Sequence, residues 1–314
     1  MVRVKLRLIP KTFVVLCIIT GSVYIIWLRQ SLHRCRSLIQ KHRKSLEVVI
    51  NPHIYTFVIN SPGKCSGSDV FMVVMVTSAP HNHAQRHAIR HTWGNESNIP
   101  GTGIKTVFAV GTTNDASTQQ GLHYENKIHK DIIQEDFLDS YKNLTLKTVM
   151  CLKWASEFCP NAKFVLKADD DTFVNIFSLV RYLRELDSAA AKRFVTGYVY
   201  SGARPIRRSN SRWYLSTEVY PRKSFPEYPA GFAYVISNDI TGLIYKVSMT
   251  LKYIFLEDVF LGLCLERLNV NVLHDKRFNP WTGSPSCKTG KELASHWVKT
   301  HDAMVRAWHN VTKC

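Results

Sequence analysis

The sequence predicts one large α/β domain of three layers, in which helices cover both faces of a central β-sheet. Short apolar runs rich in β-branched residues alternate with longer helical segments over residues 70–268. The first run, VFMVVMVT at 70–77, is apolar almost throughout, which is typical of a central strand with both faces buried. Alternation of such strands with helices is characteristic of layered α/β proteins.

The predicted elements follow one another along the chain. Each predicted strand is a short run of β-forming residues. These runs are Val70–Thr77, Thr106–Val110, Phe164–Leu166, Phe194–Val199 and Tyr234–Ile236. The segments with helical character, which would cover the sheet, are Leu144–Phe158, Ile176–Leu186 and Leu256–Leu268. With 314 residues the chain has room for one catalytic-sized domain and a smaller appendage.

The N-terminal part predicts that appendage to be a membrane anchor. Residues 12–28 form a run of 17 without a charge, which at about 1.5 Å per residue just crosses a thin bilayer. A cleaved signal peptide is the alternative, but Ser22-Val23-Tyr24 hardly resembles its small-residue cleavage site. We therefore expect a tail at 1–11, an uncleaved signal anchor at 12–28, a basic stem at 29–65 and the folded domain at 66–314.

The charge distribution excludes a nucleic-acid binder and favours contact with membrane lipid. The formal net charge is +17, but residues 1–64 contain eleven Lys or Arg against one Glu. This leaves only +7 for residues 65–314, whereas a nucleic-acid binder concentrates charge on its folded face. The basic residues instead flank the apolar run, where anionic lipid headgroups would attract them.

Eight cysteines and three glycosylation triplets are compatible with an oxidising, lumenal compartment. Cys17 lies in the predicted span and Cys35 just beyond it, and six cysteines lie in the predicted domain. Those six allow 15 pairings, and the sequence does not choose among them. The Asn-x-Ser/Thr triplets, which are candidate glycosylation sites, begin at Asn95, Asn143 and Asn310.

The most distinctive local feature is KADDDTFVN at 167–175, where a predicted buried strand ends in Asp169, Asp170 and Asp171. Carboxylates this close repel one another, and a hard divalent cation with oxygen ligands relieves that repulsion. Ligands also gather at the carboxyl ends of strands in open α/β sheets. The alternative is that Asp171 caps a helix beginning near Phe173 while its neighbours are solvated.

A second pair of acids, Glu257 and Asp258, opens the apolar segment FLEDVFLGLCLERL at 255–268. Acids in the first turn of a helix are favoured by the helix dipole, so simple helix stabilisation is one interpretation. The apolar neighbours Leu256, Val259 and Phe260 predict a half-buried carboxylate. Such a carboxylate could serve as a general base.

Six sequence motifs follow one another along the chain. They are RHAIRHTWG at 86–94, DIIQEDFLDSYKNLTLKT at 131–148, ADDDTFVN at 168–175, RWYLSTEVYP at 212–221, FPEYPAGFAYVIS at 225–237 and LEDVFLGLCLERL at 256–268. In this order, and over most of residues 70–300, the chain resembles the β1,3-glycosyltransferases, the family of β1,3-galactosyltransferases and β1,3-N-acetylglucosaminyltransferases. The resemblance implies a Rossmann-like sheet of GT-A type and a single-pass type II Golgi membrane protein with a lumenal catalytic domain.

The resemblance also implies a donor site for UDP-galactose or UDP-N-acetylglucosamine with Mn²⁺ or Mg²⁺. Asp171 is the expected direct metal ligand, and His296 matches the position of a second protein ligand. Asp169 is expected at the metal or the nucleotide, and Asp170 at the donor. Imidazole suits Mn²⁺ better than Mg²⁺.

Arg86, Arg90 and Lys147 are further candidates for the donor. A spacing of four places Arg86 and Arg90 on one face of a helix, and planar guanidinium donors suit a diphosphate or uracil. A solvated basic helix face is the alternative for the two arginines. Lys147 is a weaker candidate for contact with the diphosphate.

The acceptor, a glycan on a glycoprotein or glycolipid, is expected at the segment around 212–237. Trp213 and Tyr228 are aromatic residues of the kind that stack on sugar rings, and Gly231 and Glu257 complete the predicted acceptor site. The segment departs from the family, whose members often carry Cys and Gly-x-Gly here, where this chain has Pro229 and Gly231-Phe232-Ala233. That departure leaves acceptor specificity open.

The expected reaction is an inverting single displacement in which Asp258 deprotonates an acceptor hydroxyl and UDP leaves. Two alternatives of other classes are a lectin-like protein that keeps the fold without turnover and a metal-dependent phosphodiesterase. The latter needs more dispersed acidic or His ligands than the sequence offers. A homodimer is compatible with the sequence, which does not settle the oligomeric state.

Overall fold

The structure, a computed structural model, describes residues 24, 27–32, 34, 48–67, 69–281 and 292–313. It divides the chain into two units, Met1–Val49 and Ile50–Cys314. Most of the predicted tail, anchor and stem lies outside the described residues; Tyr24, Trp27 and Leu28 are helical and exposed. Among the residues that are described, we find no helix with the length and apolar character that a membrane crossing requires.

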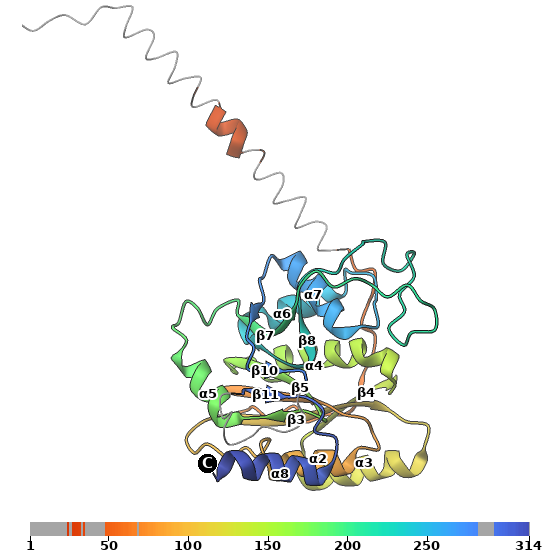
Figure 1. Ribbon diagram of the computed structural model, residues 1–314, viewed down its shortest axis with the longest axis vertical. Helices are drawn as coiled ribbons and strands as arrows, with labels where there is room; N and C mark the ends of the chain where they lie inside the picture. Colours follow the sequence, from red (N-terminus) through yellow and green to blue (C-terminus); the bar gives the residue numbers. More distant parts are fainter. Residues whose placement is uncertain are drawn as a thin grey trace, which may run out of the picture. The chain divides into compact units, whose positions relative to one another are not determined.

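The folded unit is built on an eight-stranded sheet in the order β1-β4-β3-β2-β5-β8-β7-β9 (Figure 1). Its middle strands β4, β3, β2 and β5 are parallel, whereas β8 is antiparallel to β5 and β7 is antiparallel to β8. The strands are β1 (Phe57–Ile59), β2 (Met72–Thr77), β3 (Ile104–Thr112), β4 (Ile132–Leu138), β5 (Phe164–Asp169), β7 (Val195–Tyr200), β8 (Tyr228–Ser237) and β9 (Leu273–His274). A smaller sheet is ordered β10-β11-β6, from Phe278–Asn279, Ala294–Ser295 and Phe173–Val174.

Helices cover both faces of the large sheet, which confirms the predicted three layers (Figure 1). One face carries α2 (His83–His91), α3 (Ala116–His129), α5 (Ile176–Glu185) and α8 (His301–Thr312), and the other carries α4 (Leu144–Phe158), α6 (Asn238–Ser248) and α7 (Glu257–Leu268). Successive side chains of a strand point to opposite faces. Accordingly Val74 joins the core under α2, whereas Met75 joins the core under α4 with Trp154.

The five predicted strands and three predicted helices are confirmed, and the ends of all of them except the helix at 144–158 are shifted. The strand β4 was not predicted, because its sequence IIQEDFL mixes apolar and charged residues, although Gln134 and Glu135 are fully buried. The alternative in which Asp171 caps a helix beginning near Phe173 is wrong. Phe173 and Val174 form the strand β6, and the helix α5 is capped instead by Asn175, whose Oδ1 accepts a hydrogen bond from the Ser178 N–H (3.1 Å).

The predicted boundary between stem and domain at residue 65 is wrong, because residues 50–65 belong to the folded unit. The strand β1 pairs antiparallel with β4 and closes that edge of the sheet. The backbone N–H of Ile50 also donates to the Met249 carbonyl (2.9 Å). The whole stretch 29–65 was taken for stem because it is basic and lacks a clear period. Residues 50–65 contain Lys64 as their one Lys or Arg, and a strand of three residues is too short to show a period.

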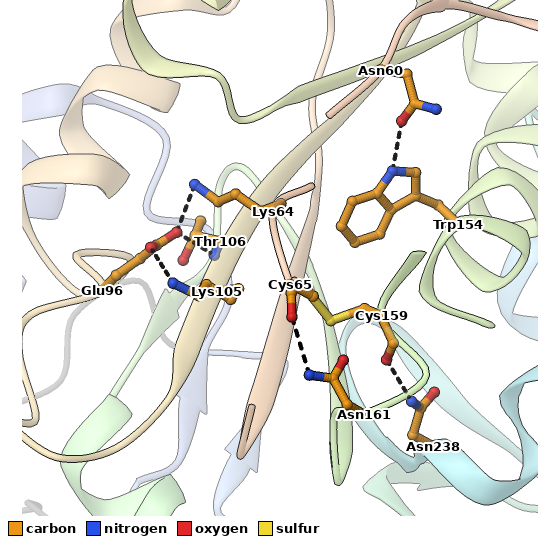
Figure 2. Close-up of a disulfide and its surroundings, with 10 residues drawn as sticks. All are labelled: Asn60, Lys64, Cys65, Glu96, Lys105, Thr106, Trp154, Cys159, Asn161 and Asn238. Atoms are coloured by element: carbon orange, nitrogen blue, oxygen red, sulfur yellow. Dashed lines mark hydrogen bonds and ion pairs between the residues drawn. A yellow bond between two sulfur atoms is a disulfide. The ribbon is translucent and has the colours of Figure 1, made fainter. Parts of the chain in front are cut away.

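A disulfide between Cys65 and Cys159 fastens this N-terminal segment to the end of α4 (Figure 2). Side-chain amides on both sides of it support the two backbones: Asn161 donates to the Cys65 carbonyl (3.1 Å) and Asn238 to the Cys159 carbonyl (2.9 Å). The cysteines at 151 and 264 are buried free thiols. Those at 17, 35, 287 and 314 lie outside the described residues.

Candidate active site

The aspartate triplet lies at the carboxyl end of β5, beside the end of β2. Asp169 Oδ1 accepts a hydrogen bond from Thr77 Oγ1 (2.7 Å), its register partner across the sheet. Asp170 turns toward the segment after β2, where its Oδ2 accepts from Ser78 Oγ (2.6 Å) and Asn82 Nδ2 (2.9 Å). Burial raises the pKa of Asp170. Asp169 and Asp171 are more open to a ligand than Asp170, which is tied to the protein.

The small sheet brings His296 to the triplet. The strand β11 pairs antiparallel with β6, and the Val298 N–H donates to the Asp171 carbonyl (2.8 Å). His296 Nε2 then lies 3.3 Å from Asp171 Oδ1. The next residue, Trp297, has a φ of 69°, a strained value for a bulky side chain. Such strain persists only where the surroundings enforce it, and here it accompanies the turn that presents His296.

Asp169, Asp171 and His296 together could hold a metal ion, because their ligand atoms all lie within 4.8 Å of one another. This arrangement agrees with the ligand set that the family resemblance implied. Two carboxylates and one imidazole suit Mn²⁺, which accepts nitrogen more readily than Mg²⁺ does. All three side chains are partly exposed, so an ion would have open coordination positions for a ligand.

Glu257, which was expected to orient either the acceptor or Asp258, faces the interior of the protein. Its Oε2 accepts a hydrogen bond from Thr148 Oγ1 on α4 (3.0 Å), and its Oε1 lies 3.1 Å from Lys167 Nζ. These contacts leave Glu257 as a support behind the site. The apolar residues around it predicted partial burial, but they could not show which way the carboxylate turns.

Asp258, the next residue, keeps a partly exposed side chain at the start of α7. Its Oδ1 accepts a hydrogen bond from the Val259 N–H (2.8 Å). Burial of the carboxyl and the charge of Glu257 raise the pKa of Asp258 to about 7. A carboxylate with a pKa near neutrality is suited to take a proton from a hydroxyl.

Lys167 connects the two groups of acids and was missed by the sequence reasoning. Its ammonium lies 2.6 Å from Asp169 Oδ1 and 3.1 Å from Glu257 Oε1, and it donates to the Gly231 carbonyl. The residue is 4 % exposed. Burial alone would lower the pKa of Lys167, but the two carboxylates outweigh it and raise that pKa. One signal could have found it: a lysine on an apolar strand, two residues before Asp169, shares its face.

The strand β8 packs closely against the start of α7. A Cβ placed on Gly231 would lie 2.4 Å from Glu257 Oε1, so a side chain there would force the Glu257 carboxylate to move, whereas its 3.5 Å distance to Asp258 Cβ is an ordinary contact. Tyr228 is buried, with its ring 5.5 Å from that of Tyr200. Burial and the nearby charge of Asp258 raise the pKa of Tyr228. Gly231 and Tyr228 therefore both border Asp258, and their contact with an acceptor stays a prediction.

Arg86, Arg90 and Lys147 lie behind the site and are engaged by protein groups. Arg86 and Arg90 share one face of α2, as predicted, and both reach Glu125 (2.7 Å each). Arg90 Nε also lies 2.8 Å from Asp131 Oδ2. These contacts give both arginines a role in positioning, and their direct contact with the donor stays a prediction.

Lys147 and Arg86 both support the segment after β2. Lys147 Nζ donates to the Ser78 carbonyl (2.6 Å) and lies 2.8 Å from Asp139 Oδ2. Arg86 Nη1 donates to Ser78 Oγ (3.2 Å), the hydroxyl that binds Asp170. Both are buried, and both hold Ser78, whose hydroxyl binds Asp170.

The remaining predicted residues lie at the surface. Trp213 is 46 % exposed, and its Nε1 donates to Tyr141 Oη (2.8 Å). Asn95 and Asn310 are exposed, as glycosylation requires. Asn143 is half-buried, and its amide nitrogen donates to the Leu138 carbonyl (2.7 Å). Attachment of a glycan at Asn143 would compete with that hydrogen bond.

Comparison with known proteins assigns the chain to a class. Residues 84–276 match the galactosyltransferase family, and the chain belongs to it. It is 39% identical over 264 residues to human beta-1,3-galactosyltransferase 1, covering 84% of this chain and 80% of that one. It is 42% identical over 223 residues to human lactosylceramide 1,3-N-acetyl-beta-D-glucosaminyltransferase, covering 69% and 59%. Among solved structures, the galactosyltransferase LgtC aligns with a TM-score of 0.37 at 12% identity, covering 72% and 87%.

Proposed function

We propose that this protein is an inverting, metal-dependent β1,3-glycosyltransferase that moves galactose, or N-acetylglucosamine, from a UDP-sugar to a hydroxyl of a glycan. The observation that carries the proposal is the ion-paired chain Asp169–Lys167–Glu257, which joins the candidate metal ligands to the residue preceding Asp258. These ion pairs support a reaction in which the first group binds the donor and Asp258 activates the acceptor. Membership of the galactosyltransferase family supports the same reaction.

In the proposed reaction the Asp258 carboxylate accepts the proton of the acceptor hydroxyl. The hydroxyl oxygen forms a bond to the anomeric carbon, and the bond from that carbon to the diphosphate breaks with its electron pair on the leaving oxygen. A single displacement inverts the anomeric centre and needs no covalent enzyme intermediate. Glu257 and Lys167 hold the start of α7 in place while Asp258 acts.

Asp169, Asp171 and His296 would hold Mn²⁺, or less suitably Mg²⁺. When bound, such an ion offsets the negative charge that develops on a departing diphosphate. The protein contributes the orientation of the ligands: Thr77 holds Asp169, and the strained turn at Trp297 holds His296.

We further propose a type II Golgi membrane protein with a GT-A type catalytic domain in the lumen and glycoprotein or glycolipid acceptors. The disulfide Cys65–Cys159 and the exposed triplets at Asn95 and Asn310 support a lumenal compartment. If the proposal is correct, endoglycosidase treatment lowers the apparent mass of the wild-type protein from cells. Untreated Asn95→Gln protein should also have a lower apparent mass than the untreated wild type. A protein without attached glycan would contradict the lumenal assignment.

The function is tested with the full-length protein in detergent and Mn²⁺. Each UDP-sugar is offered with a panel of β-linked glycan acceptors, and the product linkage is determined by NMR. A β1,3-linked product supports the proposal. Release of UDP without acceptor does not, and absence of product with every donor and acceptor, or an α-linked product, contradicts it.

A further inference from the structure

The loop between β7 and β8, residues 201–227, concentrates positive charge beside the proposed acceptor site. It contains six Lys or Arg and two Glu, so it carries +4 of the +7 on residues 65–314. The rest of residues 65–314 carries the remaining +3. Positive charge gathered on one loop attracts an anionic ligand, and the attraction is strongest for a ligand bound at that loop.

Some of these cations are used within the loop and its surroundings. Arg207 donates to the carbonyls of Leu215 (2.7 Å) and Tyr220 (2.7 Å), which holds the loop in shape. Arg222 forms a two-pronged ion pair with Glu266 of α7 (2.6 and 2.7 Å). These two arginines explain the fold of the loop and are not available to a ligand.

The other cations are exposed and lack acidic partners. Arg204, Arg208 and Lys223 form no ion pair with any residue that the structure describes. Arg212 is also exposed, and its guanidinium lies 4.3 Å from the ring centre of Tyr141 and 5.3 Å from that of Trp213. Stacking on two aromatic rings holds a guanidinium in place without using its N–H donors.

Trp213, Tyr141 and Arg212 form an aromatic and cationic platform, which we call the 212–213 platform. The Trp213 ring is anchored by its hydrogen bond to Tyr141, yet almost half of the residue remains exposed. An exposed, fixed indole offers a flat apolar face, and such faces bind sugar rings. The adjacent guanidinium offers hydrogen bonds that match the paired oxygens of a sulfate or carboxylate.

The 212–213 platform lies close to the start of α7. Tyr253 Oη donates to the Lys142 carbonyl (2.7 Å), and Thr145 Oγ1 donates to the Ile254 carbonyl (2.7 Å). These bonds place Tyr141 and its neighbours beside residues 253–254, a few residues before Asp258. The other end of the loop leads into Tyr228, whose pKa is raised in part by the charge of Asp258.

We propose that the preferred acceptor carries an anionic group, a sulfate or a carboxylate, which the free arginines of the 201–227 loop bind while Trp213 supports an adjacent sugar ring. This inference rests on the transferase activity proposed above. Asp258 then acts on a hydroxyl of an acidic glycan, and binding of its charge weakens at high ionic strength.

The test compares each anionic acceptor with its own neutral counterpart, with the full-length enzyme and its active donor. The probes are an N-acetylglucosamine β-glycoside with its 6-O-sulfated form, and a β-glucoside with the matching β-glucuronide. We expect a KM about fivefold lower for an anionic acceptor, an advantage that salt reduces, because exposed charge contacts are modest. The two anionic probes distinguish sulfate from carboxylate. Equal KM values for charged and neutral acceptors at low salt would overturn the inference.

Substitutions locate the effect. In Arg208→Ala/Arg212→Ala the ratio of KM values for neutral and anionic acceptors should fall toward one. The control Lys127→Ala/Lys246→Ala removes the same charge from exposed positions on α3 and α6 and should keep the wild-type ratio. A ratio lowered equally by both pairs would mean a general charge effect. If the loop pair loses only its binding to phosphatidylserine vesicles and keeps its acceptor preference, the loop contacts lipid and the inference fails.

Failure of the transferase itself is recognised separately. Binding of the sulfated and neutral glycosides to donor-free protein is measured by saturation-transfer NMR. Sulfate-dependent binding that is lost in the loop pair supports the anionic site even if no product forms with any donor. Product formation without any preference for charged acceptors would support the proposed transferase activity and contradict only the inference of an anionic acceptor.

Discussion

Two groups of neighbouring acids, Asp169 to Asp171 and Glu257 with Asp258, look alike in the sequence but differ in the structure. In the triplet, Asp169 and Asp171 stay partly exposed and gain His296 as a neighbour. In the pair, Glu257 is buried against Lys167, and Asp258 has its pKa raised to about 7. The first arrangement suits a cation and the second suits a proton. Both groups consist of neighbouring carboxylates, so the difference arises from what each group packs against.

The largest expected effect separates the proton acceptor from the cation site. Asp258→Asn removes the base, and we expect kcat to fall by about 10³-fold or more while UDP binding with Mn²⁺ persists. Asp302→Asn, which changes a first-turn acid at the exposed start of α8, is the control and should keep full activity. Calorimetry and steady-state kinetics measure the two properties. Loss of both in Asp258→Asn would indicate a structural role and remove the contrast between the groups.

The next prediction breaks the link between the groups. Lys167→Met leaves two carboxylates without their buried partner, and we expect the free energy of unfolding to fall by about 3–5 kcal/mol. Adding Glu257→Gln neutralises one of them and should restore part of that loss. Lys163→Met, at an exposed position just before β5, is the control. Urea denaturation measures all four proteins. An equal loss in both lysine variants would mean that Lys167 does not join the two groups.

A smaller effect concerns the cation site alone. His296→Ala should weaken Mn²⁺ binding in the presence of UDP by more than about tenfold, because loss of even an outer hydrogen-bond partner has that effect on metal sites. His301→Ala, an exposed histidine at the start of α8, should leave the affinity unchanged. Calorimetric titration with Mn²⁺ measures both. The ligand assignment fails if His296→Ala binds the ion as tightly as the wild type.

The smallest effect is a shift in pH dependence. Asp258 must lose its proton to act as a base, so kcat/KM should rise as the pH increases through about 7 and level off above it. Glu257→Gln removes a neighbouring negative charge that raises the pKa of Asp258, so the midpoint should move down by about one unit. Glu157→Gln, at an exposed position on α4, should not move it. An unchanged midpoint in Glu257→Gln would show that Asp258 does not sense its neighbour.

The layers of the fold could be predicted because buried strands and helices have recognisable apolar patterns in the local sequence. The apolar run at 70–77 gave a central strand, and 144–158 gave a helix with the observed ends. The strand β4 has no such apolar pattern. Its buried Gln134 is instead satisfied by a polar partner elsewhere in the chain, because Gln134 donates a hydrogen bond to the Gly111 carbonyl (2.8 Å). A polar strand of this kind becomes recognisable only when its partners are in place.

Residues of the candidate site could be predicted where the local sequence identifies them. Contacts with partners that are remote in the sequence could not be predicted. The end of a buried strand identified Asp169 and Asp171, and only the family resemblance suggested His296. Helical spacing placed Arg86 and Arg90 on one face, but Glu125, which engages both, is remote in sequence. Nothing local reveals that partner, so the spacing alone suggested a free pair of donors.

The pairing of β1 with β4 limits how far the chain can be shortened for expression. A fragment beginning at Ser66 lacks Cys65, so Cys159 becomes an unpaired thiol, and it uncovers the outer rim of β4. Uncovered strand edges recruit other chains and lead to aggregation. Secreted versions of the enzyme should therefore begin no later than Ile50, where the first backbone bond to the folded unit is made.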